Sequence, residues 1–193
     1  GEDLLFLESY KSSLRLANGK TIEFRPMLPS DEFSSRNFFY SLHEKTVYYR
    51  YFAKIRIFSH EMLQRQWASV DYRNNMSILG LVQKGGHKEI MAIASYAKVS
   101  DTVAEVAFVV KEELQHMGVG SYLLRVLEGI ARENGFTTFT ATVLRVNTAM
   151  IQVFKNRYPN PKITYEGSEM ELTMSFDDVL PEKEKGGNDL GPG

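Results

Sequence analysis

The sequence predicts a single α/β domain built on one mixed sheet, with the element order β-α-α-β-β-β-α-β-α-β-β. Two observations carry this prediction. Three nearly continuous apolar runs, at residues 76–83, 90–99 and 103–110, are typical of strands in the middle of a sheet that is covered on both faces. After Gly118 the apolar spacing changes to the helical period, so a long helix follows the third run.

The elements before these runs are a strand and two helices. Residues 21–25 alternate between polar and apolar side chains and are closed by Pro26, which indicates a strand. Ser30 is expected to cap the first helix, which has acidic side chains in its first turn. A second helix is expected to begin at Ser59. The aromatic residues of the first helix that we assign to the core are Phe33, Phe38 and Phe39.

The elements after these runs alternate between helices and strands. The helix from Gly118 is expected to end at Asn134-Gly135, with Glu128 and Arg132 paired at i,i+4 on its outer face. The remaining expected elements are a strand at 136–144, a helix at 147–157 and a hairpin over 164–176 that turns near 167–168.

The length of 193 residues fits one domain. We assign residues 14–180 to this domain and residues 1–13 to an N-terminal extension or linker. Residues 181–193 are expected to form a disordered tail, because they contain too few apolar side chains to offset the entropy of ordering.

Composition excludes several classes of protein. The chain has no Cys, which rules out a disulfide scaffold, a zinc–thiolate site and a thiol nucleophile, and its four His lack metal-ligand spacing, so no metal is expected. The formal net charge of -1 argues against a protein that binds nucleic acid by charge alone. No apolar run approaches the roughly 18–20 residues that span a bilayer, and the N-terminus is acidic where a signal peptide would be basic. The sequence therefore predicts a cytoplasmic protein with no nucleic-acid or membrane partner.

A glycine-punctuated turn connects the third apolar run to the long helix. Its sequence is Gln115-His-Met-Gly-Val-Gly120, and it follows Val110 by five residues. Free backbone N–H groups at a helix N-terminus, beside glycines that admit a ligand, suit a phosphate group. The same residues would also serve a plain β-α turn, and local chemistry leaves both interpretations open. A Walker loop is excluded because no Lys follows Gly120, and a dinucleotide fingerprint is excluded because Leu123 stands where its third Gly belongs.

This motif resembles the Q/R-x-x-G-x-G/A signature of the GNAT superfamily of N-acetyltransferases, and the expected element order matches that fold over about residues 14–176. Other segments resemble the branch that contains bacterial protein-lysine acetyltransferases, including GNAT domains fused to acyl-CoA synthetases or to acetyl-CoA hydrolase/transferases. These segments are Thr46-Val-Tyr-Tyr-Arg-Tyr-Phe52, Ala104-Glu-Val-Ala-Phe-Val-Val110 and Asn147-Thr-Ala-Met150. Residues 10–19 are similar to the beginning of such a fused domain.

The resemblance implies that acetyl-CoA is the acetyl donor. Its pantetheine arm would pair, like an added strand, with Phe108, Val109 and Val110. Asn147 stands at the family's position for a side-chain contact to that arm, and it is also expected to cap the following helix. The pyrophosphate would lie on the loop formed by Gln115, His116, Met117, Gly118, Val119, Gly120 and Ser121.

Glu105 is the candidate catalytic residue. By alternation it shares a face with Val103, Ala107 and Val109, so it is an acid in an otherwise apolar strand. A carboxylate withdrawn from water is a stronger base, which suits a general base near neutral pH. From the residues alone, a structural carboxylate paired with Arg or Lys is the commoner case. The resemblance implies the catalytic role, because the matching glutamate of protein-lysine acetyltransferases is assigned as their base.

One position departs from the family's pattern. Many members have Tyr seven residues after the helix-start Asn, where its hydroxyl can protonate the leaving thiolate, and this sequence has Phe154. Tyr158 and Tyr165 follow without an assigned role. Either solvent supplies the proton or the site is degenerate.

The resemblance therefore implies acetyl transfer from acetyl-CoA to a primary amine, with a protein lysine preferred to a small-molecule amine as acceptor. The alternative is a non-catalytic acyl-CoA-sensing domain that regulates a fused or neighbouring CoA enzyme, and Phe154 is the feature that favours it. The aromatic residues at 48–52 are interpreted as core and substrate-groove lining rather than as stacking positions for nucleic acid.

Overall fold

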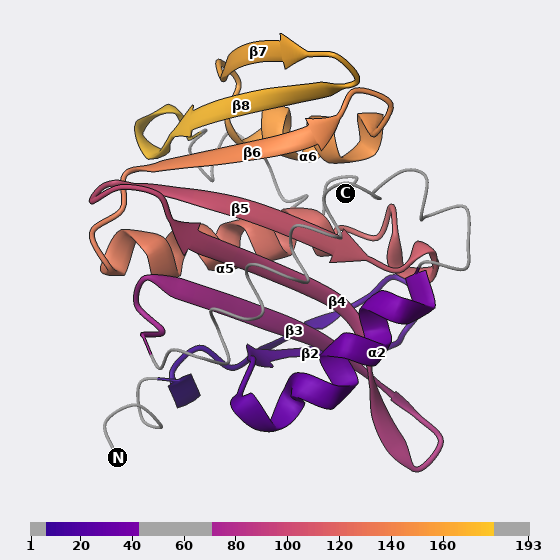
Figure 1. The fold of residues 1–193 in the computed structure, drawn as a ribbon. Coiled ribbons are helices and arrows are strands. Elements are labelled where there is room, and N and C mark those ends of the chain that lie inside the picture. The colour runs from indigo at the N-terminus through magenta and orange to yellow at the C-terminus, as the bar shows by residue number, and fades with distance from the viewer. Residues whose placement is uncertain (1–6, 43–70, 180–193) are drawn as a thin grey trace.

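A computed structural model describes residues 7–42 and 71–179. These residues form one eight-stranded sheet with the order β1-β2-β3-β4-β5-β6-β8-β7 (Figure 1). The strands are β1 (Ser12–Arg15), β2 (Thr21–Pro26), β3 (Asn75–Lys84), β4 (His87–Lys98), β5 (Val103–Val110), β6 (Thr138–Leu144), β7 (Lys162–Glu166) and β8 (Glu169–Ser175). The helices are α2 (Glu32–Leu42), α5 (Val119–Glu133) and α6 (Thr148–Arg157), with single 3-10 turns at η1 (Pro29–Asp31), η3 (Glu112–Leu114) and η4 (Phe176–Asp178). The predicted α/β class with one mixed sheet is confirmed.

Three predictions concern residues outside the described ranges. They are the aromatic segment at 46–52, the helix from Ser59 and the disordered tail at 181–193.

The sheet is antiparallel except where β5 and β6 run parallel. α5 makes the crossover between these two strands, as a parallel connection requires. β5 has the predicted bounds, and the three apolar runs form β3, β4 and β5 in the middle of the sheet. The sheet has one strand more than predicted, because β1 pairs with β2 from Ser12 opposite Phe24 to Arg15 opposite Thr21. The sheet thus begins two residues before the boundary that the sequence analysis places at residue 14.

Helices cover the two faces of the sheet unequally (Figure 1). α5 and α6 lie on one face, where side chains such as Leu127 and Phe154 pack against strands from β2 to β8. α2 lies on the opposite face through Phe38, Phe39 and Leu42. The strand residues of that second apolar cluster belong to β3, β4 and β5 and are Leu79, Leu81, Ile90, Ile93, Ala97 and Val109.

Two local predictions at the start of α2 are wrong. Ser30 is not an N-cap, because it lies inside the 3-10 turn η1, whose N-cap is Leu28. The polar side chain that bonds at this end is Asp31, which accepts the backbone N–H of Leu28 at 2.8 Å and pairs with Arg25 at 2.7 Å. The side chain of Phe33 is 73% exposed and is not part of the core. Phe38 and Phe39 follow it by five and six residues, or about 1.4 and 1.7 turns, so Phe33 points away from the face that those two rings share.

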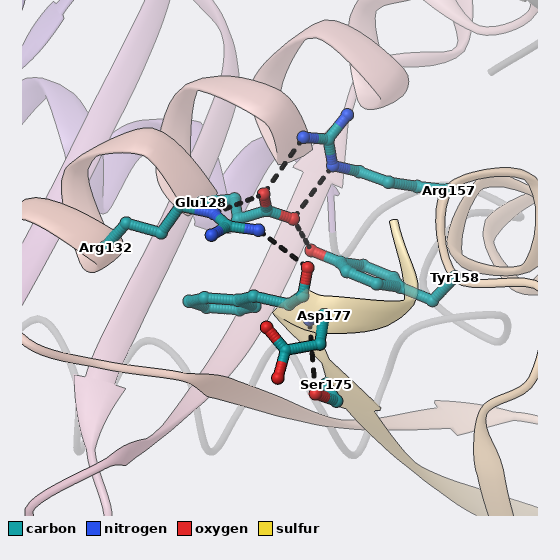
Figure 2. Close-up of polar contacts among 7 residues, drawn as sticks. Glu128, Arg132, Arg157, Tyr158, Ser175 and Asp177 are labelled. Atoms are coloured by element: carbon teal, nitrogen blue, oxygen red, sulfur yellow. Dashed lines mark hydrogen bonds and ion pairs between the residues drawn. The ribbon is translucent and has the colours of Figure 1, made fainter. Parts of the chain in front are cut away.

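Glu128 is a third correction, because it is buried rather than on the outer face of α5. Its side chain is 3% exposed and lies between α5 and the end of α6 (Figure 2). It pairs with Arg132 at 2.9 Å as predicted, and it also accepts hydrogen bonds from Arg157 at 2.9 and 3.0 Å and from the hydroxyl of Tyr158 at 2.5 Å. The network ties the last turn of α6 to the middle of α5.

The side chain of Glu128 stays ionised despite its burial. Burial alone would raise the pKa of Glu128, but hydrogen bonds from Arg157 and Tyr158, together with the positive charge of Arg157, hold this pKa below the ordinary value of 4.5. Burial and the Glu128 carboxylate raise the pKa of Tyr158 well above its usual range. The carboxylate therefore stays charged and the phenol stays protonated across the neutral range.

Replacing Glu128 with Gln should cost about 3–5 kcal/mol of unfolding free energy, because Arg157 keeps its charge in a buried position without a counter-ion. The matched control is Glu32→Gln on α2, which removes an i,i+4 partner of Arg36 at a half-exposed position and should cost at most about 0.5 kcal/mol. Urea denaturation at pH 7 measures both. Equal losses in the two variants would contradict the account of the network.

The pH dependence of this stability follows from the lowered pKa. A carboxylate whose pKa is lower in the folded than in the unfolded chain stabilises the fold fully above the unfolded value of about 4.5, and this contribution is lost as pH falls through the lower folded value. The stability difference between wild type and Glu128→Gln should therefore be constant near neutral pH and should narrow below about pH 4.5.

Candidate functional site

The site begins where two neighbouring strands diverge. β5 and β6 are in register only from Val103 opposite Thr138 to Glu105 opposite Thr140. Beyond this point β5 continues to Val110 against β4, while β6 continues against β8, and Figure 1 shows the two strands separating. From residue 106 to residue 110, no described strand pairs with the edge of β5 that faces β6. An extended ligand with amide groups could pair with this edge as an added strand would.

The loop between β5 and α5 is folded tightly around two left-handed residues. Gly118 has φ 81° and His116, a non-glycine residue, has φ 63°. The side chain of Gln115 donates to the carbonyl oxygen of Val110 at 3.1 Å, which fixes the loop to the end of β5. Gly118 is the N-cap of α5 and makes no side-chain cap bond. The first N–H groups of a 15-residue helix therefore lack a capping side chain and can meet an anion.

A pocket lies between this loop, β5 and α6. It includes predicted residues from the strand end and the loop, and it also includes three residues of α6 that the sequence analysis missed. The lining residues are Phe108, Val110, Gln115, His116, Gly120, Ala149, Met150 and Val153. Ala149, Met150 and Val153 share one side of α6, since their spacings are one and four residues. That helical spacing after Asn147 is the signal that could have identified them.

The other predicted residues of the strand end and the loop do not line the pocket and lie in the core or at the start of α5. Val109 faces the α2 side of the sheet, in the second apolar cluster. Val119 is fully buried and Met117 packs against the main core. Gly118 begins α5, and Ser121 lies half-buried in its first turn.

Asn147 caps α6, as the sequence analysis predicts. Its side-chain oxygen accepts the backbone N–H of Met150 at 3.2 Å, and the residue is 3% exposed. This bond places Asn147 at the helix end that carries the pocket residues Ala149 and Met150. The contact to a bound ligand stays a prediction.

Glu105 lies in the last register pair before the strands diverge. Its partners across the sheet are Ala97 of β4 and Thr140 of β6. The side chain is half-buried and lies on the sheet face opposite α5 and α6. Within residues 7–42 and 71–179, no ion pair or hydrogen bond engages its carboxylate. The alternative of a carboxylate paired with Arg or Lys therefore has no described partner to support it.

The two tyrosines that follow the predicted position of a general acid make contacts outside the pocket. Phe154 is buried and packs edge-to-face on Phe108, with ring centroids 5.8 Å apart. Tyr158 donates its hydroxyl to Glu128, and Tyr165 is exposed with Arg145 stacked over its ring. Of the described pocket-lining side chains, the one with a titratable group is His116.

The described part of the chain contains neither a membrane-spanning helix nor a metal-binding cluster. None of its helices has the length and apolar character required to cross a membrane. Nor does it bring together three His, Cys, Asp or Glu side chains in an arrangement that could hold a metal ion.

Comparison with known proteins agrees with this architecture. The acetyltransferase (GNAT) family model matches residues 37–157, which is more than half of the chain. An acetyltransferase of Pseudomonas aeruginosa is 28% identical over 136 residues, covering 70% of this chain and 73% of that protein. The acetyltransferase Pat of Mycolicibacterium smegmatis is 29% identical over 142 residues, covering 72% of this chain but only 41% of Pat.

A solved structure extends the likeness to three dimensions. The GNAT domain of S. lividans PAT superposes with a TM-score of 0.64 at 25% identity, over 86% of this chain and 97% of that domain. The family match, the acetyltransferase relatives and the shared fold all identify an acyltransferase. The chain belongs to the acetyltransferase (GNAT) family.

Proposed function

We propose that this protein transfers the acetyl group of acetyl-CoA to a primary amine, and that the acceptor is a protein lysine. The observation that carries the proposal is the position of Glu105. Its carboxylate stands in the last paired row of β5 and β6, so a base lies where the gap suited to the donor begins.

The donor would use the gap, the loop and the pocket together. The unpaired edge of β5 at Phe108 to Val110 would bind the pantetheine amides. The loop from Gln115 to Ser121 and the N-terminus of α5 would hold the pyrophosphate. Because the oxygen of Asn147 is used in the cap, its amide N–H group is the part that would contact the arm. These residues fit acetyl-CoA in chemistry and in order along the gap.

The acceptor amine has a protonation problem that Glu105 would solve. The pKa of a lysine amine, near 10.4, is about 3.4 units above pH 7. Forming the neutral amine at pH 7 therefore costs roughly 4.6 kcal/mol. Glu105 would take the proton as the amine nitrogen bonds to the thioester carbon and the carbon–sulfur bond breaks. A backbone N–H near Val110, on the open edge of β5, would stabilise the oxyanion. The leaving thiolate would take its proton from solvent, since Phe154 replaces the family's tyrosine.

The choice of a protein lysine is supported by the resemblance to protein-lysine acetyltransferases and by the relatives named Pat and PAT. Phe154 is the feature that would suit a non-catalytic acyl-CoA sensor, but the curated relatives are named acetyltransferases, which favours an enzyme. The chain spans less than half of Pat. The fused or neighbouring CoA enzyme that the resemblance implies stays a proposed partner. The use of acetyl-CoA also suits a cytoplasmic location, as the sequence predicts.

The acceptor class can be tested by CoA release with a panel of amines. The panel contains a lysine peptide with a blocked N-terminus, the same peptide with Arg in place of Lys, and an aliphatic polyamine. We expect the highest kcat/KM for the lysine peptide and none for the Arg peptide. A polyamine preferred by more than about tenfold would contradict the protein-lysine assignment.

A further inference from the structure

The half of the sheet formed by β6, β8 and β7 has one apolar and one polar face. The apolar face carries Phe139, Ala141, Leu172 and Met174, which are buried beneath α5 and α6. The residues between them point to the other face. There the register places Thr140 opposite Thr173, and Thr142 opposite Glu171.

This polar face continues directly from Glu105. Residues opposite each other in a ladder share a face of the sheet. Glu105 is opposite Thr140, and the row continues through Thr173 of β8 to Lys162 of β7. The next rows add Glu171, and then Glu169 opposite Glu166. We call this surface the open face and define it by Glu105, Thr140, Thr142, Lys162, Glu166, Glu169, Glu171 and Thr173.

Among the described helices, none covers the open face. α2 packs on β3, β4 and β5, and α5 and α6 lie on the opposite side of the sheet (Figure 1). Glu166 and Glu171 are exposed, while Thr140, Thr142 and Thr173 are half-exposed. Within residues 7–42 and 71–179, the sheet therefore presents hydroxyl and carboxylate groups, rather than a second apolar layer, on this side of Glu105.

The charge on this surface is mostly negative. The described register places four acidic side chains on it, Glu105, Glu166, Glu169 and Glu171, and one basic side chain, Lys162. An ordinary solvated strand face mixes both signs. No ion pair within residues 7–42 and 71–179 joins Glu166 or Glu171 to a basic side chain. The open face therefore has a negative field next to the candidate base.

The divergence of β5 and β6 is a separate observation that points to a ligand at the same place. The gap begins at the Glu105 row, and the Glu105 side chain is directed to the open face because it shares that face with Thr140. α5 and α6 fill the other side of the sheet. As far as the described residues go, the side of the sheet from which an amine can reach the Glu105 carboxylate is the open face.

We propose that the open face binds the protein segment around the acceptor lysine and selects segments with further Lys or Arg residues near it. This inference rests on the proposed function, because it assigns the acceptor to the same site. The carboxylates attract and orient the cationic segment, and the threonine hydroxyls can bond to its backbone.

The strand spacing gives the expected distance of the selecting charges from the acceptor. β8 is two strands from β5, or about 10 Å away, and an extended peptide rises about 3.3 Å per residue. Glu171 of β8 also lies two residues along the strands from the Glu105 row, so it is about 12 Å away and should act on residues three or four positions from the acceptor lysine. Glu166 of β7 lies three strands across and four residues along, about 20 Å away, so it should act on residues about six positions from the acceptor lysine.

Binding can be tested without turnover. Two fluorescein-labelled peptides carry a central acetyl-lysine and differ only at the third, fourth and sixth positions on both sides, which are Arg in one and Glu in the other. Fluorescence anisotropy should show the Arg peptide binding at least about tenfold more tightly at low salt, with the difference shrinking as ionic strength rises. The double variant Glu166→Lys/Glu171→Lys should lose this preference while its affinity for acetyl-CoA is unchanged.

The matched control is Glu8→Lys/Glu23→Lys, which makes the same change in net charge at exposed positions near the other edge of the sheet. It should keep the preference. If the charge-reversed variant does not fold, Glu166→Gln/Glu171→Gln is tested instead. It should reduce the logarithm of the affinity ratio of the two peptides by about half.

Failure of the inference differs from failure of the proposed function. Equal binding of the two peptides, or a preference that survives charge reversal, would overturn the open face as the acceptor surface. If unmodified lysine versions of both peptides are not acetylated although the binding preference is intact, the proposed function fails and the surface remains a binding site for basic segments.

Discussion

The Glu105→Gln variant should acetylate a lysine peptide about 10²–10⁴-fold more slowly at pH 7 than the wild type, with little change in its affinity for acetyl-CoA. Gln keeps the shape and the hydrogen-bonding capacity of the side chain but cannot take the proton of the amine. Because no described ion pair or hydrogen bond engages the Glu105 carboxylate, the melting temperature should be unchanged. A quenched CoA-release assay measures the acetylation rate, and thermal unfolding of the same preparation measures the melting temperature.

The pH profile separates catalysis from structure. The deficit of Glu105→Gln should shrink as pH rises towards the amine's pKa near 10.4, where the acceptor is already neutral. Glu23→Gln, at an exposed position of β2, is the control and should match the wild type at every pH. A folded Glu105→Gln variant with wild-type turnover at pH 7 would remove Glu105 from the reaction.

Gly120→Glu should weaken acetyl-CoA binding by more than about a hundredfold. Gly120 lines the pocket at the second position of α5, so the new carboxylate would stand where the donor's pyrophosphate is proposed to lie. Juxtaposed like charges cost several kcal/mol. Gly120 is within the helix and has no positive φ, so the substitution should leave the circular dichroism spectrum native. Calorimetric titration with acetyl-CoA measures the affinity.

The same helix supplies the control for this change. Gly129 is exposed on α5, and a side chain added there would meet no heavy atom within 4 Å. Gly129→Glu should therefore bind acetyl-CoA as the wild type does. Unchanged affinity in Gly120→Glu would mean that the loop is only a turn between a strand and a helix.

The central strands could be predicted because their signal is local. β3 and β4 are buried on both faces over most of their length, and β5 is apolar except at Glu105, so these strands read as nearly continuous apolar runs, and the bounds of β5 follow directly from the sequence. The loop from Gln115 could be predicted for a similar reason, because Gly118 and Gly120 are only two residues apart in the chain. The prediction for Phe33 is wrong because closeness in sequence to two core aromatic residues does not show on which side of the helix a residue lies.

The features that the sequence did not reveal depend on partners far along the chain. Glu128 and Arg132 are four residues apart and look like a surface pair, but Arg157 and Tyr158 approach from the end of another helix, so Glu128 is buried while Arg132 stays half-exposed. The open face is equally hidden, because Glu105 and Glu171 become neighbours on one surface only through the registers of β5, β6 and β8. Residue spacing within one segment carries no information on such pairings.

Transfer of a labelled acetyl group is the most direct test of the central claim. The full chain is mixed with acetyl-CoA labelled in its acetyl group and with a blocked peptide that contains one lysine, and the peptide is analysed by mass spectrometry after a single turnover. The account predicts that the label is on the lysine side chain, and that Glu105→Gln slows its appearance while the donor still binds. If the chain binds acetyl-CoA but the label stays on the donor with every amine offered, the account is contradicted. The protein would then be an acyl-CoA sensor.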